Sequence, residues 1–191
     1  MSMSALSPAA FEARYVGGRD PWSFGKNAYE LGRYQAILAS LRRSAYETVY
    51  EPGCSVGVLT QQLGAIAGCV IAADFAPSAT LQAQARCANQ PNVHIVCADV
   101  GAFVPPAPLD LVVFSEIGYY FSPADLARLA AQLAACLVPG GEFIAAHWLG
   151  HSVDHVLHGD RVHEILDDAL ALEALRTDLH PGFRLDSWIR P

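Results

Sequence analysis

The chain has 191 residues, of which 52% are hydrophobic and 16% charged, a composition that fits one globular domain with a sizeable core and excludes disorder. Its formal net charge is -7 and Lys26 is its only lysine, so no basic surface is expected for a nucleic acid. Because its apolar runs are too short to cross a bilayer and its N-terminus lacks the pattern of a secretory signal, we expect a cytoplasmic protein with no membrane partner.

The first 44 residues carry aromatic side chains and one helical pattern, but no strand pattern. Apolar residues at helical spacing occupy 29–43, and Asp20-Pro21 before them indicates a turn. We therefore predict a helical lid segment over 1–44, followed by an α/β core over 45–191, the two forming a single domain.

Five short apolar runs follow residue 45 and alternate with stretches of helical spacing. They are TVYE, CVIAAD, VHIVCADV, LDLVVFSEI and EFIAAHW. Runs that are apolar at nearly every position are typical of parallel strands with both faces covered by helices. The sequence therefore predicts an α/β fold with a doubly wound, mostly parallel sheet.

Turn and cap residues indicate where helices begin and how the chain ends. Ser78 and Ser122-Pro123 are expected to open two helices, and Asp160 is expected to cap a third. The extended segments around His180-Pro181-Gly182 predict a final antiparallel hairpin, which brings the sheet to seven strands.

A glycine-containing loop follows the first apolar run. Ligands of open α/β sheets bind at the carboxyl ends of the strands, so this loop is a candidate site. It begins at Glu51 and continues through Gly53, Cys54, Ser55 and Gly57. The two glycines allow a tight strand-to-helix turn and a close approach of a ligand to the backbone.

Acidic residues end the second and third apolar runs. Asp74 lies 23 positions after Glu51, where a carboxylate can accept hydrogen bonds from the two hydroxyls of a ribose. Asp99, followed by Val100, ends the third run. Together with the glycine loop, these residues predict a nucleoside site.

The loop favours a cationic nucleoside over a dinucleotide. It lacks the G-x-G-x-x-G order that lets a pyrophosphate approach a helix N-terminus, and Glu51 would repel phosphate. A sulfonium with its ammonium group suits an acidic site better. An NAD-dependent oxidoreductase and a cofactor-binding module without turnover remain as alternatives.

At these residues the sequence resembles the class I S-adenosylmethionine-dependent methyltransferases. A narrower resemblance, to the nodulation protein S (NodS) family, is carried by DPWSFGKNAYELGRY, YEPGCSVGVLT, FSEIGYYF, and AAHW followed by HGDRVHEIL. The resemblance implies a Rossmann-like fold, S-adenosyl-L-methionine as cofactor and S-adenosyl-L-homocysteine as product. It also implies a small-molecule acceptor, with N-methylation of an amine such as that of an amino sugar or a deacetylated chitooligosaccharide. O-methylation of another metabolite is the alternative.

The resemblance also implies roles for single residues. Those around the methionine part of the cofactor are Gly53, Ser55, Gly57, Ser115 and Glu116. Those around the adenosine part are Asp74 on the ribose, Phe75 against the adenine and Asp99 on the exocyclic amine. Those that close over the cofactor are Trp22, Tyr29 and Arg33, with Arg33 pairing with the cofactor carboxylate.

Positioning of donor and acceptor accounts for much of the rate of methyl transfer, and a base that accepts the proton of an amine is optional. The candidate catalytic residues are Glu116 after the fourth run, His147 at the end of the fifth, and His163 beyond it. Tyr119 and Tyr120 are candidates for lining the acceptor pocket.

We expect no metal site and no disulfide. The histidines after residue 150 fit no HExxH-type spacing, although His155, Asp160 and His163 could come together. The five cysteines form no CxxC pair and lie mostly in apolar runs, so we interpret them as reduced packing residues. We expect a monomer or a weak homodimer.

Overall fold

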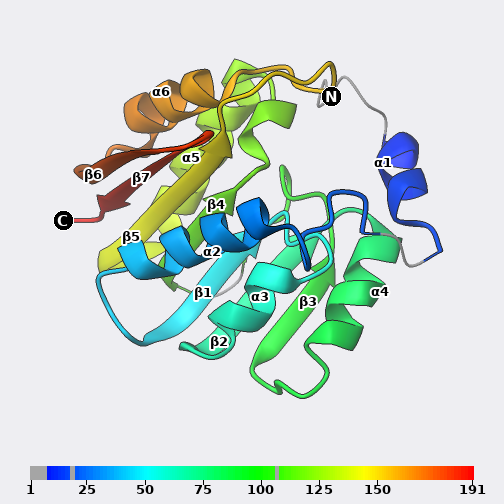
Figure 1. The fold of residues 1–191 in the computed structure, drawn as a ribbon. Coiled ribbons are helices and arrows are strands. Elements are labelled where there is room, and N and C mark those ends of the chain that lie inside the picture. Colours follow the sequence, from blue (N-terminus) through cyan, green and yellow to red (C-terminus); the bar gives the residue numbers. More distant parts are fainter. Residues whose placement is uncertain (1–7, 18–19, 106–107) are drawn as a thin grey trace. The chain divides into compact units, whose positions relative to one another are not determined.

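The computed structural model describes residues 8–17, 20–105 and 108–191, and its strands form one mixed sheet (Figure 1). The seven strands are β1 (Tyr46–Pro52), β2 (Ala67–Asp74), β3 (Val93–Cys97), β4 (Leu109–Ser115), β5 (Leu137–Trp148), β6 (Glu173–His180) and β7 (Phe183–Ile189). Their order is β3-β2-β1-β4-β5-β7-β6, with β7 antiparallel to β5 and to β6. The predicted α/β sheet with a final antiparallel hairpin is confirmed.

The residues divide into two compact units, Leu6–Phe103 and Val104–Pro191, which we describe separately. The expectation of a single domain stays a prediction.

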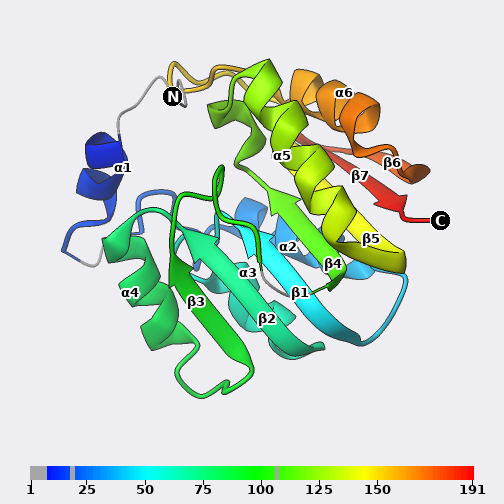
Figure 2. The ribbon, with the colours of Figure 1, turned by 180° about the vertical axis from the view of Figure 1, so that it is seen from behind.

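The first unit contains the parallel strands β3, β2 and β1 with four helices. The helices are α1 (Pro8–Tyr15), α2 (Ala28–Ser40), α3 (Val58–Leu63) and α4 (Pro77–Arg86). In Figures 1 and 2, α2 and α3 lie on the same face of β1 and β2. The parallel register places Glu51 beside Ala72 and Asp74 beside Cys97. The carboxyl ends of the three strands therefore meet at one edge of this unit.

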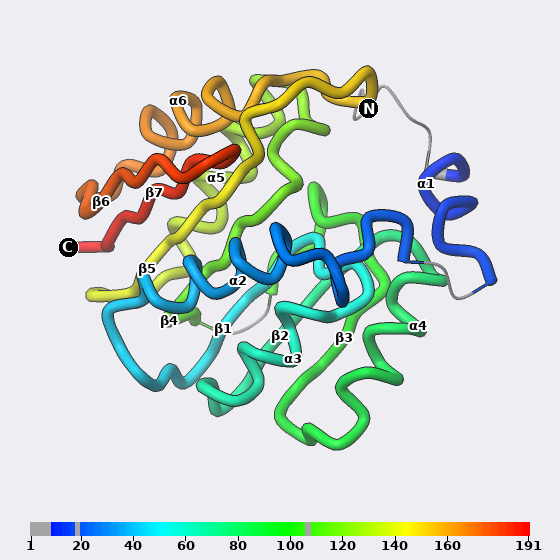
Figure 3. Tube along the Cα trace, viewed as in Figure 1, coloured from blue at the N-terminus to red at the C-terminus, as the bar shows by residue number. Residues whose placement is uncertain are grey.

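The second unit contains β4, β5, β7 and β6, the short helix η1 (Gly118–Tyr120), α5 (Pro123–Cys136) and α6 (Gly159–Leu170). The α5 helix begins where the sequence predicts, because the Ser122 hydroxyl accepts a hydrogen bond from the Asp125 amide at 3.2 Å. It packs against α6 (Figure 2), and α6 runs beside the β6–β7 hairpin (Figure 3). This packing places α6 over the end of β5.

Two predicted helix starts are wrong by two residues. The α4 helix begins at Pro77 with Ala76 rather than Ser78 as its N-cap, because proline favours the first helical position and Asp74 accepts from the Ala76 amide. The α6 helix begins at Gly159 with His158 as its N-cap, so Asp160 lies in the first turn. A side chain at 159 would collide with the Trp148 carbonyl, which explains the glycine.

The fifth strand is longer than predicted. It begins at Leu137 rather than at Glu142, and its pairing with β4 shifts register between Leu109 and Leu111. Within the described ranges, every helix is too short or too polar to span a lipid bilayer.

Candidate functional site

The glycine loop turns the chain sharply from β1 into α3. The amides of Gly53 and Cys54 both donate to the Ala73 carbonyl, at 2.7 and 3.0 Å. Gly53, Ser55 and Gly57 have positive φ angles of 78°, 48° and 77°. Ser55 is not a glycine, so its left-handed backbone costs energy and must be held by its surroundings. Strain of this kind is common at ligand-binding loops.

Gly57 also lies against a neighbouring helix. A Cβ atom at this position would approach the Cα and Cβ atoms of Ala83 in α4 to 2.9 Å. Both its φ angle and this close approach require glycine, so the loop can take its tight path only with Gly57.

Asp74 holds the loop in place. Its Oδ2 accepts from the Ser55 amide and its Oδ1 from the Ala76 amide, each at 2.9 Å. Burial raises the pKa of this carboxyl, although the backbone hydrogen bonds from Ala76, Ser55 and Phe75 oppose that change. Each carboxylate oxygen can accept a further hydrogen bond, so the group can hold both the loop and two ligand hydroxyls.

Glu51 lies beneath the same loop. It is 5% exposed, and the Thr60 hydroxyl of α3 donates to its Oε2 at 2.5 Å. Burial, with a smaller contribution from Asp74, raises the pKa of Glu51 to about 8 against the effect of Thr60. The carboxyl is therefore mostly protonated at neutral pH, and a cation placed beside it would favour its ionised form.

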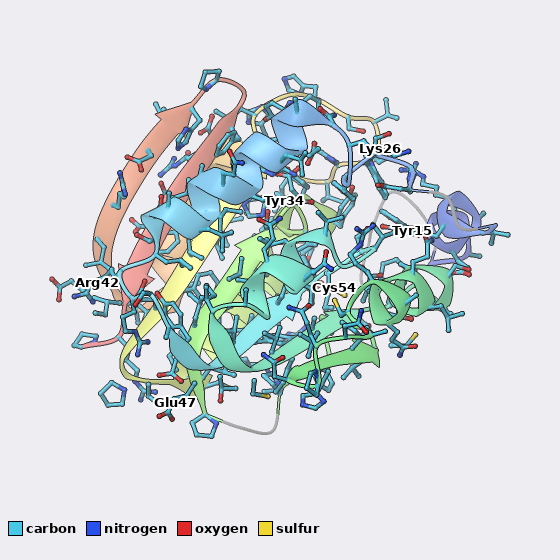
Figure 4. All side chains as sticks on the ribbon, turned by 60° about the horizontal axis from the view of Figure 1, so that its bottom comes forward. Tyr15, Lys26, Tyr34, Arg42, Glu47 and Cys54 are labelled. Atoms are coloured by element: carbon cyan, nitrogen blue, oxygen red, sulfur yellow. The ribbon has the colours of Figure 1, made fainter. Side chains whose placement is uncertain are left out.

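The N-terminal helix covers the loop. The Tyr15 hydroxyl lies 2.9 Å from the Ser55 hydroxyl, and Figure 4 labels Tyr15 and the loop residue Cys54. The Phe11 ring packs edge-to-face on Phe75 at 5.5 Å between centroids, and Trp22 lies 5.6 Å from the Tyr15 ring. These contacts place α1 on the glycine loop, and its role as a lid stays a prediction.

Sequence reasoning assigned no role at the site to Phe11, Glu12 or Tyr15. The Glu12 carboxylate accepts from both the amide and the hydroxyl of Ser78, at the start of α4, which ties α1 to that helix. The aromatic density before residue 35 was the available signal, but helical spacing within so short a helix could not identify which rings turn inward.

The other cofactor residues predicted in this unit lie in α2 and in the turn after β3. Arg33 in α2 is 1% exposed, pairs with Glu30, and lies over the Tyr29 ring at 5.6 Å. Asp99 is exposed after β3 and caps its own turn by accepting from the Gly101 amide at 2.9 Å, whereas Val100 is buried.

In the second unit, Ser115 and Glu116 end β4. The Ser115 hydroxyl is buried and has no hydrogen-bond partner among the described residues. Glu116 has a left-handed backbone with φ 61°, and its Oε1 accepts from the Trp148 amide at 2.7 Å. The Tyr119 hydroxyl accepts from the same amide at 2.8 Å. A carboxylate and a phenol therefore meet at the end of β5.

An aromatic cluster surrounds these two groups. The rings of Tyr119 and His155 are stacked at 4.0 Å between centroids, and Tyr120 meets His155 edge-to-face at 5.3 Å. Trp148 lies 6.1 Å from the same histidine ring. Burial lowers the pKa of His155, so this ring is neutral at pH 7.

His147 and His163 are both fully buried and contact each other. His147 Nδ1 lies 3.2 Å from His163 Nε2, and the Gly118 amide donates to His147 Nε2 at 3.1 Å. His163 Nδ1 lies 2.8 Å from Asp186 Oδ2, which also accepts from Arg184. Since both nitrogens of each ring are hydrogen-bonded, the geometry favours a positioning role for the two histidines.

The histidines and acids after residue 150 do not converge on one point. His155 stacks on Tyr119, Asp160 lies near His158 and Arg184, and His163 contacts Asp186. Across residues 8–17, 20–105 and 108–191, no group of three or more His, Cys, Asp or Glu side chains is arranged to hold a metal ion.

The strand order, the glycine loop and the acidic strand ends together define the Rossmann-like fold of the class I methyltransferases. The family model described as Nodulation protein S (NodS) matches residues 11–177. The chain therefore belongs to the NodS family.

Solved structures and a curated protein extend this comparison. A crystal structure of a candidate methyltransferase from Pseudomonas syringae is 31% identical and has a TM-score of 0.75, covering 86% of this chain and 100% of the other. The N-methyltransferase NodS from Bradyrhizobium japonicum WM9, solved with S-adenosyl-L-homocysteine, has a TM-score of 0.86 at 22% identity, covering 97% and 100%.

A curated protein of Triticum aestivum, phosphoethanolamine N-methyltransferase, is 28% identical over 108 residues. The match covers 55% of this chain and 21% of the wheat protein. This chain therefore corresponds to a small part of that relative.

Proposed function

We propose that this protein is an S-adenosyl-L-methionine-dependent methyltransferase that methylates an amine nitrogen of a small molecule and releases S-adenosyl-L-homocysteine. The observation that carries the proposal is the buried Asp74 carboxylate, which anchors the glycine loop and retains acceptor capacity on both oxygens. The NodS family match supports it.

The residues of the first unit fit such a cofactor. Asp74 would accept from the ribose hydroxyls, and Phe75 would contact the adenine beside Asp99. The glycine loop would approach the methionine part through its backbone, with Glu51 nearby as a buried acid that a cation ionises. When bound, the cofactor supplies an electrophilic methyl group on a sulfonium.

We assign acceptor binding to residues of the second unit. An ammonium must lose a proton before its nitrogen can attack, and the Glu116 carboxylate is the group we propose to accept that proton. Tyr120 and His155 are partly exposed and offer ring faces that suit a cation or a sugar ring, with the buried Tyr119 ring stacked on His155.

The finer proposal concerns the acceptor atom and its class. Two of the similar proteins carry N-methyltransferase in their names, which supports nitrogen over oxygen. We propose a small amine, such as an amino sugar or a deacetylated chitooligosaccharide, as the acceptor.

Calorimetric titration with S-adenosyl-L-homocysteine tests the cofactor site. We expect binding by the wild type and a loss of about 10- to 100-fold in Asp74→Ala, because hydrogen bonds to a charged group are worth about 1.5–3 kcal/mol. Asp74→Asn can still accept from one loop amide and guards against a folding defect. Asp168→Ala, an exposed change in α6, is the matched control. Unchanged binding in both Asp74 variants would defeat the assignment.

Two further measurements separate the alternatives. Fluorescence titration with NADH should show no binding, whereas an oxidoreductase would bind it. Incubation with labelled S-adenosyl-L-methionine and a panel of amines should give a labelled product, whereas a binding module without turnover retains the cofactor and labels nothing.

A further inference from the structure

A chain of hydrogen bonds in the second unit connects a surface arginine to the turn after β4. It runs from Arg184 to Asp186 on β7, then to His163 on α6, to His147 on β5, and ends at the Gly118 amide. Asp186 is 2% exposed and both histidines are 0% exposed. The links from Asp186 through the two histidines to the Gly118 amide are therefore buried, and only the Arg184 end is partly exposed.

This chain of hydrogen bonds allows only one arrangement of the protons on the two imidazole rings. The Gly118 amide can only donate, so His147 Nε2 must accept and the proton of this neutral ring lies on Nδ1. His147 Nδ1 then donates to His163 Nε2, which leaves the proton of His163 on Nδ1, facing Asp186. Arg184 also can only donate, so Asp186 Oδ2 accepts from both sides. The ring protons assigned from the Gly118 amide therefore agree with those assigned from Arg184.

Any other protonation state leaves two donors facing each other. A second proton on His147 would point at the Gly118 amide, and a second proton on His163 would point at His147 Nδ1–H. Burial raises the pKa of Asp186, but the hydrogen bonds and charges of His163 and Arg184 outweigh it, so its pKa is lowered and it stays an acceptor. Asp186 therefore supplies the acceptor that this arrangement needs at its outer end, as the Gly118 amide supplies the donor at its inner end.

The hydrogen-bonded chain ends at Gly118, beside Glu116 and Tyr119, the residues proposed to bind the methyl acceptor. Gly118 starts the short helix η1, and a Cβ atom there would lie 2.9 Å from His147 Nε2, so this turn fits only glycine against the ring. The next residue, Tyr119, accepts through its carbonyl from Val156 at 2.8 Å, and its hydroxyl meets Glu116 at the Trp148 amide. Displacement of the Gly118 amide would therefore move both acceptor groups.

We propose that Asp186 is a positioning residue for methyl transfer: oriented by Arg184, it accepts the Nδ1 proton of His163 and so stabilises the tautomers of His163 and His147, and these rings hold the 116–120 turn in its working geometry. The inference rests on the proposed function, because that function gives Glu116 and Tyr119 their role at the acceptor. Asp186 touches neither acceptor residue and acts only through the two imidazoles.

Three variants test this role. Asp186→Leu removes the acceptor, whereas Asp186→Asn keeps one, because Arg184 and His163 both donate to the Oδ2 position and hold a carbonyl oxygen there. Asp167→Leu is the matched structural control. It removes a 2.8 Å hydrogen bond between the same two elements, from Trp188 Nε1 on β7 to Asp167 on α6. It leaves the hydrogen bonds from Arg184 to Gly118 unchanged.

The measurements are the ring tautomers by long-range ¹H–¹⁵N NMR of the full chain, the affinity for S-adenosyl-L-homocysteine, and kcat and KM for an amine that the wild type methylates. We expect both rings to carry Nδ1–H in the wild type and in Asp186→Asn. In Asp186→Leu the buried Nδ1–H of His163 has no acceptor, so we expect that signature to weaken at His163 and kcat to fall about 10- to 100-fold, the range typical of outer orienting partners. Cofactor affinity should stay within about twofold in all three variants.

Each contrary result identifies what fails. An Nε2–H tautomer on His147 in the wild type overturns the inference without any variant, even if Asp186→Leu does not fold. An unchanged kcat in Asp186→Leu, or an equal loss in Asp167→Leu, also overturns it. A wild type that neither binds S-adenosyl-L-homocysteine nor methylates any amine defeats the proposed function instead.

Discussion

Glu51 stays protonated in the folded protein at pH values where a free glutamic acid is ionised, because burial in β1 raises its pKa from 4.5 to about 8. Between these two pH values the unfolded chain has released the proton and the folded chain still binds it. The free energy of unfolding must therefore fall as pH rises through this window.

We predict that Glu51→Gln removes this slope. Wild-type stability should fall between pH 5 and pH 8 by up to about 1.4 kcal/mol per pH unit, and the variant should lose much less. Urea unfolding at the two pH values measures the difference. Glu47→Gln, an exposed change on the same strand, is the control and should keep the wild-type slope.

At the residue scale, local patterns indicated the residues at the strand ends better than residues that act through a distant partner. Gly53 follows β1 directly, Gly57 ends the loop after it, and Asp74 is the last residue of β2, so spacing alone placed them at one edge. Asp186 and Arg184 could not be found that way, because their importance comes from His163, which lies 23 and 21 positions earlier in the chain. The proposed roles of Glu116 and His147 stay predictions.

At the scale of elements, α1 is held to α4 by the Glu12 side chain and by a longer hydrogen bond, at 3.5 Å, from the Gln82 side chain to the Tyr15 carbonyl. The Glu12 carboxylate accepts from the amide and hydroxyl of Ser78 in the first turn of α4, where an anion also interacts favourably with the helix dipole. The α4 N-cap, Ala76, supplies no side-chain hydrogen bond of its own.

We predict that Glu12→Ala releases α1 while the rest of the chain stays folded. Stability should fall by about 1 kcal/mol, as for loss of a helix cap, and trypsin should cut after Arg14 several-fold faster. Glu164→Ala is the control, because it breaks an exposed pair with Arg161 and should change both values little. Equal cleavage of both variants would contradict the prediction.

The existence of each strand was easier to predict than the residue at which a helix or a strand begins. A strand covered on both faces is apolar along its length, so its run is visible in the sequence. A helix start depends on which side chain reaches which amide, and at α4 that choice is made by Asp74 at the end of the preceding strand. Ser122 caps its own helix, and there the local pattern was sufficient.

At the scale of the whole molecule, the mostly parallel sheet and its final antiparallel hairpin follow from alternating runs and a turn signal, whereas the strand order comes from the structure. We predict that cofactor-product binding adds to global stability. S-adenosyl-L-homocysteine at 100 times its dissociation constant should raise the free energy of unfolding by about 2.7 kcal/mol. Thermal unfolding measures this, with NADH at equal concentration as the control. The same ligand concentration should raise the free energy of unfolding of the Asp74→Asn variant by less.

The aromatic contacts of α1 give the protein an internal optical probe. The chain has three tryptophans, and Trp22 is half-buried within 5.6 Å of Tyr15, whose hydroxyl meets the glycine loop. With Trp148 and Trp188 changed to phenylalanine, emission would come from this one indole. Stopped-flow fluorescence would then show whether the N-terminal helix leaves the glycine loop during single turnovers, without any attached dye.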